Sequence, residues 1–311
     1  MTITQLQYVL AVAEHRNFTL AAEKSFVTQP TLSMQVQKIE DELGVLIFDR
    51  SKKPIQLTEV GEKIVAQAKN IVSESGRIKD IVDQQKGFIG GEFRLGIIPT
   101  VMPTLLPMFL NNFIKKYPKV RLIIEELNTD EIIFRLNNGH LDAAIAATPL
   151  SEEKIKEIVL YYEPFVAYLP ETSESLGKKE IEINDLNPDE ILLLRDGHCF
   201  RESVLNLCKI NDNGGKFRIE SGSFETLIKL ADEGLGTTLL PYLHTLDLKE
   251  KDQSKLRHFK EPKPAREVSL IFPKSELKMH IIDALRSTIA GVVRGAVVFH
   301  NVQIVSPKAK K

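Results

Sequence analysis

Hydrophobic residues recur every three to four positions in several stretches of the first 86 residues, and this is the period of an amphipathic helix. Over residues 1–57 the pattern predicts three short helices followed by a hairpin-like wing. We expect the first helix to begin at a capping box made by Thr4 and Gln7, and a second short helix to cover residues 20–24. Residues 1–58 are therefore predicted to form a small domain of their own.

The third predicted helix has an apolar face and a face of short polar side chains. Pro30 suits its first position and Gly44 ends it, while the buried stripe is Leu32, Val36, Ile39 and Leu43. Short polar side chains near a helix start fit the major groove of DNA, and basic side chains of a wing fit phosphates. The residues predicted to contact DNA are Gln29, Pro30, Thr31, Ser33, Met34, Gln37 and Lys38 on the helix, and Arg50, Lys52 and Lys53 in the wing. The spacing alone fits an ordinary helical hairpin with a solvated polar face equally well.

Residues 59–90 are predicted to form a long helix followed by a glycine-rich hinge. The seam of this helix alternates at intervals of four and three, and consists of Ile64, Ala68, Ile71, Ser75, Ile78 and Val82. Such a narrow stripe is typical of a coiled coil and favours a second copy of the chain as partner. The alternative is that the stripe packs on the body of its own chain.

Beyond residue 91 the pattern changes to strands that alternate with amphipathic helices. Strands are predicted at residues 93–98, 120–125 and 141–146, with helices between them. This alternation predicts a mostly parallel sheet. A second α/β unit is expected from about residue 164 to 264, and a late strand at 268–272 is expected to return to the first unit.

Composition places the chain among ordinary globular proteins, with 43 % hydrophobic and 27 % charged residues in 311. Because the net charge is −1, any contact with DNA must come from local charge rather than a basic excess. No apolar run approaches the ~18 residues of a membrane span, and residues 1–17 lack the pattern of a signal peptide. We therefore expect a cytoplasmic protein with no membrane contact. The seven His and two Cys show no metal-ligand spacing, so neither a metal nor a cofactor is expected.

The two cysteines, Cys199 and Cys208, lie nine positions apart, and His198 and Arg201 flank the first of them. Two cysteines in a chain this long do not form a disulfide scaffold, and in a reducing compartment their disulfide would be transient. A dithiol in a chain that also carries a helix-turn-helix pattern indicates a sensor of oxidation that acts on a promoter. The alternative is a pair of inert buried thiols, which the spacing by itself favours.

Two sets of motifs resemble those of the LysR-type transcriptional regulators, and the resemblance covers nearly the whole chain. The first set is similar to the family's winged helix-turn-helix and linker helix, and comprises residues 18–23, 29–33, 40–50 and 57–61. The second set is similar to peroxide-sensing members of the family, and comprises residues 96–100, 128–129, 196–201 with Cys208, 235–241 and 265–266.

The resemblance implies a winged helix-turn-helix at 1–58, a linker and dimerisation helix with its hinge at 59–90, and a regulatory domain at 91–303. That domain would be an α/β structure of two lobes with a cleft, of the type-2 periplasmic-binding-protein kind. The expected lobes are 91–163 plus 268–303, and 164–267, followed by a tail at 304–311. Residues 307–311 of this tail are expected to be disordered.

The resemblance also implies partners and a signal. The partners would be double-stranded promoter DNA, RNA polymerase, a thiol reductant of the glutaredoxin or thioredoxin type, and further copies of the chain in a dimer or tetramer. Hydrogen peroxide would be the signal, and the protein would not be an enzyme.

Peroxide is attacked by a thiolate, so the surroundings of Cys199 decide its reactivity. Cys199 is expected at the start of a helix that covers residues 200–209. The helix N-terminus, Arg201 and (by resemblance) Arg266 are expected to lower its pKa and to stabilise a sulfenate. By resemblance, Thr100 and Thr129 line the cleft and bind the peroxide, with Arg266 near in space. His198 is predicted to bind the peroxide too, and the alternative is that it only orients the loop.

Geometry constrains how Cys208 could resolve that sulfenate. Nine helical residues rise about 13 Å, whereas a disulfide joins Cα atoms no more than about 6.8 Å apart. We therefore predict that Cys199 is oxidised first, that the segment between the cysteines unwinds, and that a Cys199–Cys208 disulfide then remodels the domain. Phe200 departs from the resemblance, since a smaller aliphatic residue is common there, and we expect it to change the packing and the rate of this step.

Other classes of function share parts of this pattern. A LysR-type regulator that binds a small metabolite between the lobes is the closest alternative, and it predicts that Cys199→Ser leaves induction intact. A thiol peroxidase would use the same cysteine chemistry but needs no DNA-binding domain. A periplasmic binding protein would share the lobes but is expected to carry a signal peptide.

Overall fold

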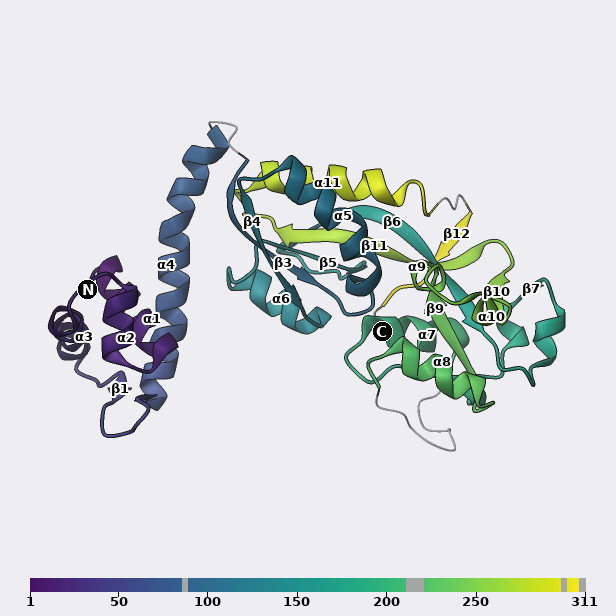
Figure 1. Cartoon of the computed structure of the whole chain (residues 1–311), viewed down its shortest axis with the longest axis horizontal. Helices are drawn as coiled ribbons and strands as arrows, with labels where there is room; N and C mark the ends of the chain where they lie inside the picture. Colours follow the sequence, from purple (N-terminus) through teal and green to yellow (C-terminus); the bar gives the residue numbers. More distant parts are fainter. Residues whose placement is uncertain (86–88, 211–220, 298–300, 308–311) are drawn as a thin grey trace. The chain divides into compact units, whose positions relative to one another are not determined.

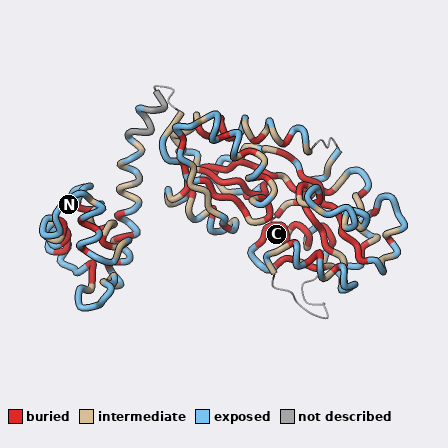
Figure 2. Tube along the Cα trace, in the orientation of Figure 1, coloured by how far each residue is buried: buried red, intermediate tan, exposed pale blue. Residues whose placement is uncertain are grey.

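The computed structural model describes residues 1–85, 89–210, 221–297 and 301–307. The chain divides into an N-terminal unit made mainly of the first 86 residues and a C-terminal unit made of most of the remainder (Figure 1). The N-terminal unit has one buried core, and the C-terminal unit has two (Figure 2). In the C-terminal unit, the first core includes Phe93, Phe109 and Ile282, and the second core includes Phe165, Leu207 and Leu240.

The N-terminal unit is a bundle of helices with a two-stranded wing. Its elements are α1 (Ile3–His15), α2 (Phe18–Lys24), α3 (Gln29–Leu43), β1 (Phe48–Asp49), β2 (Gln56–Leu57) and α4 (Glu59–Gln85), and β1 pairs with β2 in antiparallel orientation. The capping box of α1 is formed by Thr2 and Gln5, so the predicted box two residues later is wrong. Both pairs have the required spacing, and the structure uses the earlier one. The predicted three helices and wing are confirmed.

The buried face of α3 differs from its predicted stripe at one end. Leu32, Val36 and Ile39 are fully buried, whereas Leu43 is 41 % exposed and the carboxylate of Glu40 is 3 % exposed. Glu40 Oε1 accepts hydrogen bonds from two backbone N–H groups of the wing, and its Oε2 lies 2.7 Å from Arg50 Nη2. A buried carboxylate is tolerated here because its partners satisfy it.

The seam of α4 packs partly on its own unit. Ala68 is 1 % exposed, and Ile64 and Ile71 pack against the same core. Further along the helix, Ile78 is 67 % and Val82 is 45 % exposed. The alternative that the stripe packs on its own chain therefore holds for the first half of the helix only.

The C-terminal unit is built on one mixed sheet. Its first part is β3 (Gly91–Ile97), α5 (Met102–Lys116), β4 (Val120–Glu126), α6 (Thr129–Asn137) and β5 (Ala143–Thr148). These three strands are parallel, as predicted, and their order in the sheet is β4-β3-β5. The long strands β6 (Ile155–Tyr168) and β11 (Lys263–Pro273) then run antiparallel to each other, and β11 pairs with β5.

The late strand therefore returns to the first part of the sheet, as predicted, but the sheet as a whole is not mostly parallel. The long strand β6 enters both cores and runs antiparallel to β9, β10 and β11, and the hydrophobic pattern of a strand does not reveal its direction in the sheet. Helices α5 and α11 (Met279–Val293) pack together on one face of the sheet, and α6 covers the other (Figure 1).

The second part of the sheet extends from β6 and holds the cysteine segment. Its elements are β7 (Glu180–Ile181), β8 (Ile191–Leu192), α7 (Cys199–Cys208), α8 (Phe224–Asp232), β9 (Thr237–Pro241), α9 (Tyr242–Thr245), α10 (Glu250–Gln253), β10 (Leu256–Phe259) and β12 (Val302–Ile304), with 3₁₀ turns at Glu174–Gly177, Ile183–Asp185 and Pro188–Glu190. β12 pairs with β11, and Val305 after it is buried in the second core. Residues 308–311 of the expected tail lie outside the described residues.

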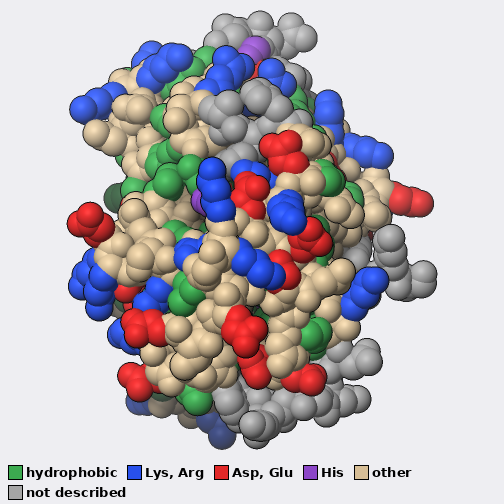
Figure 3. Space-filling view, turned by 90° about the vertical axis from the view of Figure 1, so that its right-hand side faces the viewer, with side chains coloured by type: hydrophobic (Ala, Val, Ile, Leu, Met, Phe, Trp, Pro, Cys, Tyr) green, Lys and Arg blue, Asp and Glu red, His purple; other side chains and the backbone are tan. Residues whose placement is uncertain are grey.

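The outer end of this part carries acidic and basic side chains close together (Figure 3). Exposed ion pairs such as Lys260–Glu182 and Lys178–Asp185 lie in this region. Such exposed pairs contribute little to stability, because water and salt screen them, and a surface of mixed sign offers no continuous positive field for DNA.

Candidate functional site

A buried cluster of charged side chains lies on two neighbouring strands of the C-terminal unit. Arg266 on β11 and Glu163 on β6 are paired in the strand register, and both are 1 % exposed. Arg266 Nη2 lies 2.7 Å from Glu163 Oε2, and Arg266 Nε donates to the same oxygen at 2.9 Å. The other carboxylate oxygen accepts the N–H of Leu243 at 2.9 Å. A buried pair with these partners holds its charges in one fixed geometry.

Thr100 is bound to the same arginine. It follows β3, and its hydroxyl accepts from Arg266 Nη1 at 2.8 Å while its carbonyl accepts from Nη2 at 2.9 Å. Thr129 begins α6 just after β4, so both threonines lie near the carboxyl ends of parallel strands, where ligand sites are common in such sheets. Thr129 Oγ1 is buried and has no oxygen or nitrogen partner within the described part of the chain.

Cys199 lies at the first position of α7, one residue earlier than the sequence pattern indicates. Gly197, with φ +86°, turns the chain into this helix, and His198 is its N-cap residue. The thiol is 9 % exposed and packs in the first core. Arg266, the Thr129 hydroxyl and the N–H groups of Ala147 and Phe200 all surround its sulfur closely enough to favour the thiolate.

The pKa of Cys199 is nevertheless raised, because the effect of burial is larger than the combined effect of those four groups. The prediction of a lowered pKa is therefore wrong in direction. Arg266 and the helix N-terminus act as expected, but Arg201 points elsewhere. Its Nε lies 2.9 Å from Asp196 Oδ1, and its Nη1 donates to the carbonyl of Leu194.

His198 lies beside the site but is bound to a different group. Its Nε2 accepts a hydrogen bond from Arg195 Nε at 3.4 Å, and burial followed by the charge of Arg195 lowers its pKa. The imidazole is therefore neutral at pH 7. The structure brings Cys199, Thr100, Thr129 and Arg266 together, and it orients the His198 ring towards Arg195.

Cys208 is the last residue of α7 and belongs to the second core, at 6 % exposure. Burial raises its pKa to about 12. Since one helix separates the two free cysteines and each packs in a different core, they cannot bond while α7 is intact.

Both thiols should resist alkylation in the folded, reduced protein. Burial raises both pKa values, so at pH 8 the protonated form dominates and only thiolate reacts. We expect iodoacetamide to modify each cysteine at least about tenfold more slowly than in urea, with a rate that increases from pH 7 to 9. Mass spectrometry of the alkylated peptides measures this, and a rate independent of pH would contradict it.

Two groups at this site were missed by the sequence analysis. Glu163 is the partner that keeps Arg266 charged and in place, and the only sequence signal was one carboxylate beside a strongly apolar strand. The N–H of Ala147 faces the thiol because β5 ends there, which side-chain patterns do not reveal.

The predicted DNA-contact residues lie where the sequence analysis expected them. Gln29, Pro30, Thr31, Met34, Gln37 and Lys38 are exposed along α3, Ser33 is partly buried, and Lys52 and Lys53 are exposed in the wing. Arg50 is more constrained than a free phosphate contact, since it pairs with Glu40 and its guanidinium lies 5.0 Å from the Phe18 ring centroid.

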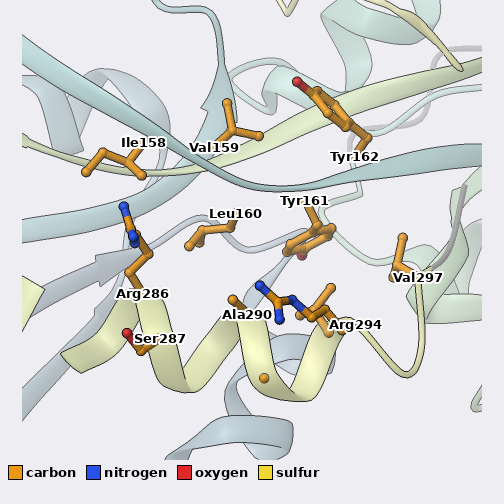
Figure 4. Close-up of a pocket in the computed structure, with 12 residues that line it drawn as sticks. Ile158, Val159, Leu160, Tyr161, Tyr162, Arg286, Ser287, Ala290, Arg294 and Val297 are labelled. Atoms are coloured by element: carbon orange, nitrogen blue, oxygen red, sulfur yellow. The ribbon is translucent and has the colours of Figure 1, made fainter. Parts of the chain in front are cut away.

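One groove lies away from the cysteine site, between β6 and α11 (Figure 4). It measures about 600 Å³ and is lined by Ile158–Tyr162 of the strand and by Arg286, Ala290 and Arg294 among the helix residues. Its lining contains neither cysteine and neither threonine of the cluster. Among the described residues, no group of three His, Cys, Asp or Glu is arranged to hold a metal ion. The helices within the described ranges are too short or too polar to cross a membrane.

Comparison with known proteins matches each of the two units to a family of the LysR type. Residues 3–62 match the bacterial regulatory helix-turn-helix family of the lysR type, and residues 86–293 match the LysR substrate binding domain. The chain is 32 % identical to the hydrogen peroxide-inducible genes activator of Pectobacterium carotovorum, over 94 % of this chain and 98 % of that protein. It is 32 % identical to the DNA-binding transcriptional dual regulator OxyR of Escherichia coli K12, over 94 % and 97 %.

Solved structures give the same assignment. A full-length OxyR variant from Pseudomonas aeruginosa matches with a TM-score of 0.72 and 35 % identity, over 93 % of this chain and 98 % of that one. A peroxide-bound OxyR mutant from Corynebacterium glutamicum matches with a TM-score of 0.64 and 27 % identity, over 97 % and 98 %. The winged helix-turn-helix, the two-core α/β unit and these matches together show that the chain belongs to the LysR family of bacterial transcriptional regulators.

Proposed function

We propose that this LysR-family protein activates transcription in response to hydrogen peroxide, through oxidation of Cys199 and a Cys199–Cys208 disulfide. The observation that carries the proposal is that α7 begins at one free thiol and ends at the other, with each thiol in a different core. Relatives named hydrogen peroxide-inducible genes activators support it over 94 % of the chain.

In the first step, the Cys199 thiolate attacks one oxygen of the peroxide. The O–O bond breaks, the sulfur becomes a sulfenate, and the second oxygen leaves as water after gaining a proton. Arg266 and the N–H groups of Phe200 and Ala147 would stabilise the negative charge at the sulfur. Thr100, Thr129 and Arg266 are the proposed peroxide contacts. His198 is proposed to position the Gly197 turn, because its ring is already bound to Arg195.

In the second step, the Cys208 sulfur attacks the Cys199 sulfenic acid, the S–O bond breaks, and water leaves as the disulfide forms. The Cα atoms of the two cysteines are about 13 Å apart along an intact helix, so α7 must unwind first. Because α7 packs in both cores, its unwinding would change the shape of the lobes and so the geometry of the DNA-binding units.

The remaining partners follow from this role. The exposed part of the α4 seam, Ile78 and Val82, would pack on a second copy of the chain in a dimer that can build a tetramer. The exposed face of α3 would enter the major groove, with Lys52 and Lys53 on phosphates. RNA polymerase would be the partner at the promoter. A glutaredoxin or thioredoxin type reductant in the cytoplasm would restore the thiols.

Footprinting on the chain's own upstream region tests the proposal. Peroxide should change the footprint of the wild type, leave that of Cys199→Ser unchanged, and leave Cys208→Ser with a trappable sulfenate but no disulfide. Peptide mapping after the same peroxide dose should recover the 199–208 cross-link. If Cys199→Ser still responds, the thiol mechanism is wrong and a metabolite-binding regulator becomes the better explanation.

A further inference from the structure

Phe200 follows the sensor cysteine and is buried at 2 % exposure. It is the second residue of α7, and its ring contacts three groups outside this helix. The ring centroid lies 5.1 Å from that of Phe165 on β6 and 5.1 Å from that of Phe224 on α8, the latter at an interplanar angle of 85°. The guanidinium carbon of Arg266 on β11 lies 5.2 Å from the same ring. Phe200 therefore fastens the first turn of α7 to three other elements.

The contact with Arg266 connects this packing to the sensor. Glu163 and Thr100 hold the guanidinium in place through hydrogen bonds. An aromatic ring close to a buried cation is attracted to it. Burial raises the pKa of Cys199, and the same guanidinium opposes that effect by favouring the thiolate. Phe200 thus packs on the cation that would stabilise the sulfenate on its own neighbour in the chain.

The contacts continue beyond Phe224. The centroid of the Phe224 ring lies 5.1 Å from that of His244, just after β9. The first turn of α7 therefore packs against a series of aromatic rings in contact with one another. Offset and edge-to-face aromatic pairs are favourable beyond the area they bury. The two pairs that involve Phe200 are lost if the first turn of α7 leaves the cluster.

We propose that Phe200 is a positioning residue that slows the conversion of oxidised Cys199 into the disulfide, and thereby sets the peroxide dose at which this chain switches. The inference rests on the proposed function and concerns its second step. Phe200 holds the first turn of α7 in place, so the sulfenate waits beside Arg266 until the aromatic cluster opens. No oxidant other than peroxide is needed, because the second step only exchanges the S–O bond for an S–S bond and releases water.

Phe200→Leu tests the proposal, because leucine fills most of the volume but has no ring. In the full-length protein mixed with one equivalent of hydrogen peroxide, the disulfide should form about tenfold faster than in the wild type. Sulfenate formation, followed with a 1,3-diketone probe in the Cys208→Ser background, should change less than about twofold. Mass spectrometry of quenched samples measures both rates.

Two further variants separate positioning from general loosening of the second core. Phe224→Leu removes one ring contact of Phe200 but leaves the Arg266 contact, so it should accelerate disulfide formation less than Phe200→Leu. Phe259→Leu is the matched control, since Phe259 is 2 % exposed in the same core and makes no ring contact with Phe200 among the described residues. Its disulfide rate should equal that of the wild type within about twofold.

The outcomes distinguish this inference from the proposed function. If the wild type forms neither sulfenate nor disulfide, the proposed function fails. If the wild type forms the disulfide and Phe200→Leu forms it at the same rate, α7 unwinds from its Cys208 end alone and only the Phe200 inference is overturned. Equal acceleration by Phe259→Leu would overturn it as well, since the effect would then be general softening of the core.

Discussion

Replacement of Arg266 by Met is expected to slow the peroxide oxidation of Cys199 by about a hundredfold and to destabilise the C-terminal unit by about 3–5 kcal/mol. The guanidinium is 1 % exposed and is the positive charge that favours the thiolate. Its loss leaves the buried carboxylate of Glu163 without its ion-pair partner. Stopped-flow mixing with peroxide measures the rate, and urea unfolding followed by circular dichroism measures the stability.

The double variant Arg266→Met with Glu163→Gln separates the two effects. It removes both buried charges together, so most of the lost stability should return, since replacing a whole buried pair costs far less than breaking it. The oxidation rate should stay low, because the positive charge near the sulfur is still missing. A double variant that regained both stability and rate would show that Arg266 acts only by holding the fold.

The same pair illustrates what the sequence could not indicate. Arg266 entered the candidate site through a resemblance, and its partner Glu163 lies 103 residues earlier in the chain. Only the register of β6 against β11 brings them together, and strand register between distant segments leaves no local pattern. By contrast, the helix from Cys199 to Cys208 follows from local spacing, and the sequence located it within one residue.

The sign of the Cys199 pKa shift was missed for a related reason. The sequence identified the helix N-terminus and the nearby cation, which are local or inferred charges. The depth of burial depends on how α7 meets the first core, and that desolvation raises the pKa more than the charges lower it. Glu40 in the N-terminal unit was missed in the same way. Apolar periodicity cannot predict that a buried carboxylate accepts hydrogen bonds from two backbone N–H groups of the wing.

Gly61→Ala is expected to destabilise the N-terminal unit by about 3 kcal/mol and to weaken promoter binding with it. A Cβ atom at this position would lie 2.1 Å from the carbonyl oxygen of Ile47 and 2.9 Å from Thr58 Oγ1. Both are held in place, because the Thr58 N–H donates to that carbonyl and the Gly61 N–H donates to the Thr58 hydroxyl. The start of α4 would have to move away from the wing.

Gly76→Ala in the same helix is the matched control, and it is expected to act in the opposite direction. Nothing lies within 4 Å of a Cβ atom built at Gly76, so alanine adds no clash there. Its lower backbone entropy in the unfolded chain should stabilise α4 by about 0.5–1 kcal/mol. Thermal unfolding of both full-length variants, followed at 222 nm, together with gel-shift titrations of the promoter, measures the pair. If Gly61→Ala and Gly76→Ala were equally stable, α4 would not depend on close packing against the wing, and the linker would be free to move independently of the DNA-binding helices.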